Sequence, residues 1–465
     1  MMPAGGGPAR GEQLAELSAV SHSILSDPET ADLLAKAEED TKLDRWQSAN
    51  LTGMRRKWAH ATALSEDLVL AFSKACTGCE TAWRTARSEA DFPAVLPHLE
   101  TLLSLVRECA AAKAEKLGLN QYDALLDEFE PGGRSADIDI RFAELEAFLP
   151  GFLNQVLERQ KANPAPPMPE GPFDPEKQRE LGLKLMTALG FNFDHGRLDV
   201  SLHPFCGGTP DDVRITTRFD EKDFSSAIMG VLHETGHALY EQGLPKDWRH
   251  QPVGEALGMA AHESQSLLIE MQMSRSRPFL EFAAPLMRDA FDGSGPAWEA
   301  DALYKNLIKV EPGFIRVDAD EITYPLHVIL RYRLEKQMIT GDLPLADLPE
   351  AWNEGMEKLL GIRPPSDREG CLQDIHWYDG AWGYFPTYTL GAMTAAQLYT
   401  SALKDEAEIA PGIPLGNFKP LTKWLNKNVH SLGSSLSVDK MVEQATGSPL
   451  GAEAFITHLK TRYLA

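Results

Sequence analysis

Two histidines four residues apart, with a glutamate directly after the first, form the segment best suited to do chemistry. His233, Glu234 and His237 make an H-E-x-x-H pattern within a run of apolar residues at helical spacing. Residues four apart share one helix face, so both imidazoles can reach one metal ion while Glu234 lies beside them. Neutral imidazoles suit Zn²⁺, and a nearby carboxylate can take a proton from the bound water. The alternative, two histidines placed by chance in an amphipathic helix, is disfavoured, since chance matches number on the order of a few hundredths.

A catalytic zinc ion normally takes three protein ligands, so a third side chain is expected downstream. The tenth position after His233 is Gly243, which excludes the extended motif with a third histidine. The acidic candidates that follow are Glu241, Glu255, Glu263 and Glu270. We predict Glu263, in the middle of a helix expected from residue 254 to about residue 274, because its small neighbours allow two helices to approach closely. A solvated acid on a helix face is the alternative.

Six short motifs follow one another along the chain. They are His203-Pro204-Phe205, Asp212-Val213-Arg214-Ile215-Thr216, His233-Glu234-Thr235-Gly236-His237, His262-Glu263-Ser264-Gln265, Ile315-Arg316-Val317-Asp318-Ala319-Asp320 and Gly370-Cys371-Leu372-Gln373-Asp374-Ile375-His376-Trp377. Together they resemble the motifs of the carboxypeptidase Taq family of zinc metallocarboxypeptidases. Several ordered motifs are far more specific than one.

The resemblance implies removal of single residues from peptide C-termini, with broad specificity. It also implies a mainly α fold with a deep central groove, and a homodimer. Glu263 is supported as the third ligand, and the expected cofactor is Zn²⁺, with Co²⁺ as the alternative ion. The expected partners are peptides with a free C-terminus.

A carboxypeptidase must bind the free carboxylate of its substrate, and a guanidinium can do so with two parallel hydrogen bonds. The resemblance assigns this role to Arg316. The alternative is an arginine at a helix end that pairs with Asp318 or Asp320.

Further side chains are expected around the reacting carbonyl and the ligands. His376, Tyr384 and Tyr388 could donate hydrogen bonds to a developing oxyanion, although aromatic clusters more often belong to the core. His203 and His262 could orient ligands or substrate, because metal-binding side chains usually need outer hydrogen bonds. Structural histidines are the equal alternative for this pair.

The elements that must position these residues are mostly helical. Residues 1–162 form a predicted N-terminal helical region, and a proline-rich stretch at 163–178 marks the boundary with a catalytic region, residues 163–465. Short β-branched runs between residues 191 and 220 predict a hairpin or a three-stranded sheet next to the metal site. Both regions are expected to form one peptidase unit around a groove.

Composition excludes several other classes. A net charge of −23 disfavours nucleic-acid binding, which requires lysine and arginine against phosphates. No run approaches the length of a membrane span, and five cysteines suggest no disulfide framework, so we expect a cytoplasmic protein. Two competing hypotheses remain: a zinc oligopeptidase or dipeptidase, and a non-catalytic protein stabilised by zinc.

Overall fold

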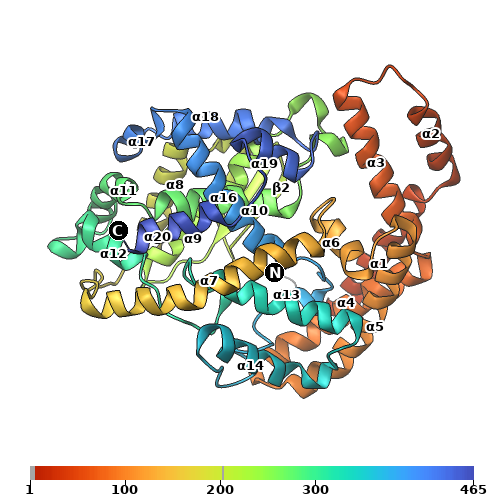
Figure 1. Ribbon diagram of the computed structural model, residues 1–465, viewed down its shortest axis with the longest axis horizontal. Helices are drawn as coiled ribbons and strands as arrows, with labels where there is room; N and C mark the ends of the chain where they lie inside the picture. The colour runs from red at the N-terminus through yellow and green to blue at the C-terminus, as the bar shows by residue number, and fades with distance from the viewer. Residues whose placement is uncertain (1–5, 202–203, 465) are drawn as a thin grey trace. The chain divides into compact units, whose positions relative to one another are not determined.

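The structure, a computed structural model, describes residues 6–201 and 204–464 (Figure 1). This part of the chain contains twenty α-helices and one three-stranded sheet. The prediction of a mainly α fold with a small sheet is confirmed. None of the described helices combines the length and the apolar character that crossing a membrane requires. His203 lies outside the described residues.

Two compact units make up the chain, and each combines stretches that are distant in sequence. Unit 1 consists of Met1–Pro150, Pro312–Ala319 and Thr323–Pro386, whereas unit 2 consists of Gly151–Glu311, Asp320–Ile322 and Thr387–Ala465. The chain therefore passes between the units several times. The boundary after residue 162 stays a prediction about functional organisation.

Unit 1 is helical throughout its described residues. Its N-terminal stretch forms α1 (Gly7–Leu25), α2 (Pro28–Glu38), α3 (Arg45–Ala63), α4 (Glu66–Glu89), α5 (Phe92–Leu117), α6 (Gln121–Phe129) and the first half of α7 (Ser135–Ala162). Its later stretches form η7 (Arg316–Asp318), α13 (Tyr324–Thr340), η8 (Leu345–Asp347), α14 (Leu348–Leu360) and α15 (His376–Asp379). The helix α5 packs against α4 and buries Leu99, Leu102 and Val106 at helical spacing.

Unit 2 contains the sheet and the remaining helices. Before residue 312 it includes α8 (Pro175–Leu189), η2 (Phe193–His195), α9 (Phe224–Gly243), η3 (Lys246–Trp248), η4 (Pro252–Gly254), α10 (Met259–Leu267), η5 (Leu268–Ser274), α11 (Arg277–Ala290), η6 (Pro296–Trp298) and α12 (Ala300–Leu307). Its C-terminal stretch forms α16 (Pro386–Asp405), α17 (Ile409–Gly412), η9 (Ile413–Leu415), α18 (Lys419–Asn428), η10 (His430–Leu432), α19 (Val438–Thr446) and α20 (Glu453–Leu464).

The sheet has β3 (Asp212–Thr217) in the middle. It runs parallel to β1 (Gly196–Val200) and antiparallel to β2 (Phe205–Thr209). A close-packed core joins this sheet to α8 and α9, with Met186, Leu198, Ile215, Val231 and Ala238 all buried. The sheet thereby fixes the face of α9 that points away from the histidine pair.

The helix expected from residue 254 to about residue 274 begins later than predicted and changes its winding. Residues Pro252–Gly254 form a 3-10 turn instead, in which a Cβ on Gly254 would lie 2.0 Å from the carbonyl oxygen of Trp248. The α-helix α10 begins at Met259, and the segment after it, η5 (Leu268–Ser274), is a π-helix. Such wider turns occur mostly as single bulges and frequently at functional sites.

Candidate metal centre

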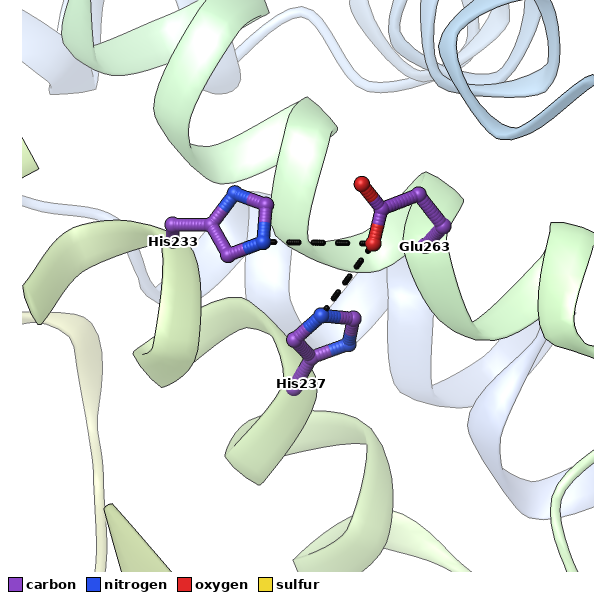
Figure 2. Close-up of side chains that lie close together, drawn as sticks. All are labelled: His233, His237 and Glu263. Atoms are coloured by element: carbon purple, nitrogen blue, oxygen red, sulfur yellow. Dashed lines mark ion pairs between the residues drawn. The ribbon is translucent and has the colours of Figure 1, made fainter. Parts of the chain in front are cut away.

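Three side chains with metal-binding atoms converge where α9 meets α10. His233 and His237 extend from one face of α9, and Glu263 reaches toward both from α10 (Figure 2). The Oε2 atom of Glu263 lies 3.9 Å from Nε2 of His233 and 3.3 Å from Nε2 of His237. One ligand atom from each residue lies within 4.8 Å of the others.

The approach of α10 to α9 depends on a glycine inside the H-E-x-x-H segment. A Cβ on Gly236 would lie 2.4 Å from the carbonyl oxygen of Gln265 and 2.6 Å from Cα of Ser266. No side chain fits there, so the two backbones touch and Glu263 can reach the histidines. A second glycine, Gly391 on α16, allows close packing on the other side, since its Cβ would lie 2.7 Å from Cβ of Glu263.

The donor set fits a divalent transition metal. Ligands about 2.0–2.1 Å from a tetrahedral zinc ion lie roughly 3.3–3.4 Å apart. The separation of 3.3 Å between His237 and Glu263 matches this value, whereas that of 3.9 Å between His233 and Glu263 is longer. Two imidazole nitrogens and one carboxylate oxygen form the ligand set of one class of catalytic zinc site, which leaves a fourth position open. The three groups would therefore need only small adjustments to bind one ion.

The other ring nitrogen of His233 is held by an acidic side chain from the π-helix. Its Nδ1 lies 2.9 Å from Oε2 of Glu270, and Glu270 Oε1 accepts from Nη2 of Arg275 at 2.7 Å. Arg275 also donates to the carbonyl oxygen of Leu307. With Nδ1–H bonded to Glu270, the Nε2 lone pair of His233 faces Glu263.

A different partner holds His237. Its Nδ1 lies 2.6 Å from Nδ1 of His262, whose Nε2 lies 2.8 Å from Oε1 of Glu241. If His237 Nδ1 carries the proton, His262 must accept at Nδ1 and donate from Nε2 to Glu241. Glu241, which the sequence offered as an alternative ligand, thus contacts His262 in the structure.

Three carboxylates surround the two imidazoles and give the site a negative character. Burial raises the pKa of Glu234 to about 7; Glu263 and Glu270 add to this effect and His233 opposes it. Burial disfavours the charged form of His233, but the neighbouring carboxylates, Glu263 foremost, outweigh it and raise the pKa of this imidazole to about 10. Burial lowers the pKa of His237 to about 4. Excess carboxylate charge around two imidazoles favours occupancy by a cation.

The predicted carboxylate-binding arginine lies in unit 1 and is firmly held. Arg316, in η7, is 5% exposed, and its Nη2 donates to Oδ1 of Asp374 at 2.8 Å. Arg331 donates to the other oxygen of Asp374 at 2.6 Å. Asp374, which pairs with both arginines, belongs to the last of the six motifs.

His376 and Tyr384 lie together in unit 1. Their ring centres are 5.4 Å apart, and Phe385 packs 4.6 Å from the imidazole. Burial lowers the pKa of His376 to about 4, so the ring is neutral at pH 7. Tyr384 is half-buried.

Tyr388 belongs to α16 in unit 2, one helical turn before Gly391. Residues three apart share a helix face, so Tyr388 lies on the side of α16 that packs against Glu263. It too is half-buried.

Sequence reasoning missed three contributors to these arrangements. Glu270 appeared only as a candidate ligand, and the spacing of apolar residues gives no sign of the π-helix that aims it. Asp374 stood in a quoted motif without a role. Gly391 carries no chemical signal, because its importance is the absence of a side chain beside Glu263.

The sequence matches, over residues 1–463, the family model described as carboxypeptidase Taq (M32) metallopeptidase. Thermostable carboxypeptidase 1 of Thermus thermophilus is 37% identical over 478 residues, which cover 100% of this chain and 93% of the relative. Carboxypeptidase 1 of Bacillus subtilis is 35% identical over 465 residues, covering 99% and 92%. The solved structure of Trypanosoma cruzi metallocarboxypeptidase 1 is similar with a TM-score of 0.96 and 41% identity, covering 100% of this chain and 94% of that one.

Proposed function

The chain belongs to the carboxypeptidase Taq family of metallopeptidases, and from this membership we propose a zinc-dependent carboxypeptidase that releases single amino acids from peptide C-termini. The protein is a peptide hydrolase, and its family has carboxypeptidase activity. Zinc as the ion and broad specificity for the last residue are the proposed refinements.

In this proposal His233, His237 and Glu263 hold the ion, which is Zn²⁺ with Co²⁺ as an active substitute. When bound, such an ion acts as a Lewis acid toward a carbonyl oxygen and makes water more acidic. The side chains support the proposal because each imidazole directs Nε2 toward Glu263 while its Nδ1 is engaged elsewhere. Among the arrangements described, this convergence is the observation that carries the proposed function.

Glu234 moves the proton. It follows His233 on α9, is 7% exposed, and has a pKa raised to about 7. A carboxylate oxygen of Glu234 takes a proton from the attacking water and then gives it to the nitrogen of the leaving amine.

Arg316 binds the free C-terminal carboxylate and so selects exopeptidase substrates. Asp374 positions its guanidinium, and a planar fork suits a carboxylate. His376, Tyr384 and Tyr388 donate hydrogen bonds to the substrate around the oxyanion. For neutral His376 the donor is a ring N–H, and for the tyrosines it is the phenol.

The proposal extends to the residues around the ligands, the groove, the oligomeric state and the cellular location. His262 orients His237, together with Glu241; for His203 the same kind of role rests on the resemblance alone. A deep groove and a homodimer also rest on the resemblance. A cytoplasmic location is supported by five cysteines that are all free thiols.

The test is hydrolysis of N-terminally blocked dipeptides. We expect release of the C-terminal amino acid, loss of activity with a chelator, and recovery with Zn²⁺ or Co²⁺. The same peptides with a C-terminal amide should resist cleavage. Cleavage of the amides would indicate an oligopeptidase instead, and stoichiometric zinc without hydrolysis of any peptide would indicate a metal-stabilised binding protein.

A further inference from the structure

The π-helix η5 connects the metal centre to the C-terminal helix α20. Its Glu270 lies 2.9 Å from His233, and its backbone follows the wider winding, with the amide of Arg275 donating to the carbonyl oxygen of Glu270. A π-turn displaces carbonyl groups from the regular α-helical hydrogen-bond ladder, so a stable segment needs other donors.

Arg462 of α20 supplies those donors. Its Nη1 donates to the carbonyl oxygen of Met271 at 2.5 Å, and its Nη2 donates to that of Gln272 at 2.9 Å. The two carbonyls directly follow Glu270 in sequence. A guanidinium is suited to such a contact, because its planar fork reaches two adjacent acceptors and its charge favours the C-terminal end of a helix.

Glu321 fixes the guanidinium in turn. Its Oε2 accepts from Nη1 of Arg462 at 2.9 Å, and both side chains are nearly buried, with 4% and 6% exposed. The same carboxylate contacts Nε2 of His458 at 2.6 Å and accepts from the side-chain amide of Gln272 at 3.2 Å. Glu321 therefore ties α20 to the π-helix through a second route, and Arg462 cannot swing away without breaking a buried ion pair.

We propose that Arg462 is a positioning residue of the metal centre: by holding the carbonyls of Met271 and Gln272, it keeps Glu270 against His233. The sequence of contacts runs from α20 through the π-helix to the Nδ1 atom of His233, all within unit 2. The inference rests on the proposed role of His233 in binding metal. It adds a residue nearly 230 positions away in sequence that touches neither metal ligand nor substrate.

The competing explanation is that Arg462 merely stabilises the packing of α20. Leu459 separates the two explanations, because it lies on the same helix, is fully buried, and makes no hydrogen bond from its side chain. Leu459→Ala should weaken the packing of α20, whereas Arg462→Met should in addition release the two carbonyls. Arg462→Lys keeps the charge beside Glu321 but cannot span both acceptors.

The first measurement is the Zn²⁺ dissociation constant of the full chain, determined by competition with a chromophoric chelator. The free energy of unfolding of the metal-free protein and the visible spectrum of bound Co²⁺ are measured for each variant as well. We expect Arg462→Met to weaken zinc binding about tenfold, the lower end for residues that orient a ligand, and to alter the Co²⁺ spectrum. The zinc affinity of Arg462→Lys should lie between that of Arg462→Met and that of the unaltered chain. Leu459→Ala should lower unfolding stability and leave zinc binding within about twofold, as independent sites do.

The proposal is overturned if Leu459→Ala weakens zinc binding as much as Arg462→Met at equal loss of stability. It also fails if Arg462→Met binds zinc as the unaltered chain does. Should Arg462→Met not fold, Arg462→Lys decides the question by the same readouts. An unaltered chain that binds no zinc would instead refute the proposed function, which keeps the two failures distinct.

Discussion

At the scale of single residues, the two histidines of the H-E-x-x-H segment differ in what holds them. Nδ1 of His233 contacts the ionised carboxylate of Glu270, to which Arg275 donates a hydrogen bond. Nδ1 of His237 contacts the imidazole of His262 instead. Charged acceptors bond more strongly than neutral ones. The half of the site formed by His233 is therefore the more firmly oriented of the two.

Glu234→Gln tests the proton transfer. The amide keeps the size of the side chain but cannot accept a proton, so we expect kcat on blocked dipeptides to fall about 10²- to 10⁴-fold. Zinc content should stay at the level of the unaltered chain, because Glu234 is not one of the three converging ligands. Full activity in this variant, at normal zinc content, would contradict the mechanism.

Arg316→Lys tests recognition of the substrate carboxylate. A lysine cannot form two parallel bonds, and losing one charged hydrogen bond costs about 1.5–3 kcal/mol, so KM should rise about tenfold or more. Arg363→Lys is the matched control, since that arginine pairs with Glu350 on the surface of the same unit. Equal KM values for the two variants would contradict a role of Arg316 in binding the substrate carboxylate.

At the scale of elements, the position of Glu263 depends on how closely α9 and α10 approach. The sequence predicted Glu263, on a second helix, as the third ligand, and small residues beside it suggested close packing; in the structure this side chain lies beside both histidines. The apolar spacing of the sequence could not reveal that the contact point is Gly236, or that α10 widens into a π-helix. Both features depend on how one helix meets another, which periodicity along a single helix does not encode.

Gly236→Ala tests the helix contact. The new methyl would collide with the backbone of Gln265 and Ser266, so we expect a loss of about 1–3 kcal/mol in unfolding stability together with weaker zinc binding. Gly230→Ala, on the same helix, is the control: its nearest neighbour is Oγ1 of Thr217 at 3.8 Å, and alanine favours a helix. Equal unfolding stability and equal zinc affinity in the two variants would show that the close approach of α9 and α10 does not shape the site.

At the scale of the whole molecule, the sequence predicted the mainly α class and the small sheet, because helical spacing and short β-branched runs are local signals. Reading along the chain yields contiguous regions, whereas the compact units combine distant stretches. Interleaving of this kind depends on contacts between residues far apart in sequence. The burial of single charged residues, such as Glu335, also depends on such distant contacts, and the local sequence pattern does not predict it.

Glu335 predicts a dependence of stability on pH. It is fully buried in unit 1, accepts from the amide of Gly383 and from the hydroxyl of Tyr122, and burial raises its pKa from 4.5 to about 8. Between these values the unfolded chain ionises this group while the folded chain keeps it protonated. Stability should therefore fall as pH rises from about 4.5 to 8, by about 1.4 kcal/mol for each tenfold difference in proton affinity.

Glu335→Gln should reduce this slope, because the amide can accept from Gly383 and donate to Tyr122 without ionising. Denaturant unfolding at several pH values between 5 and 8 measures the difference between the two proteins. Parallel pH profiles would show that Glu335 does not contribute.

The interleaved path has a consequence for the order of events during synthesis. Gly391 packs against Glu263, yet it is synthesised after residues 312–386, most of which belong to the other unit. The helices α9 and α10, which carry the three converging side chains, are thus synthesised more than a hundred residues before α16, which packs against Glu263. We therefore expect a nascent chain stalled before residue 387, which lacks Gly391, to bind Zn²⁺ more weakly than the full chain in competition with a chromophoric chelator.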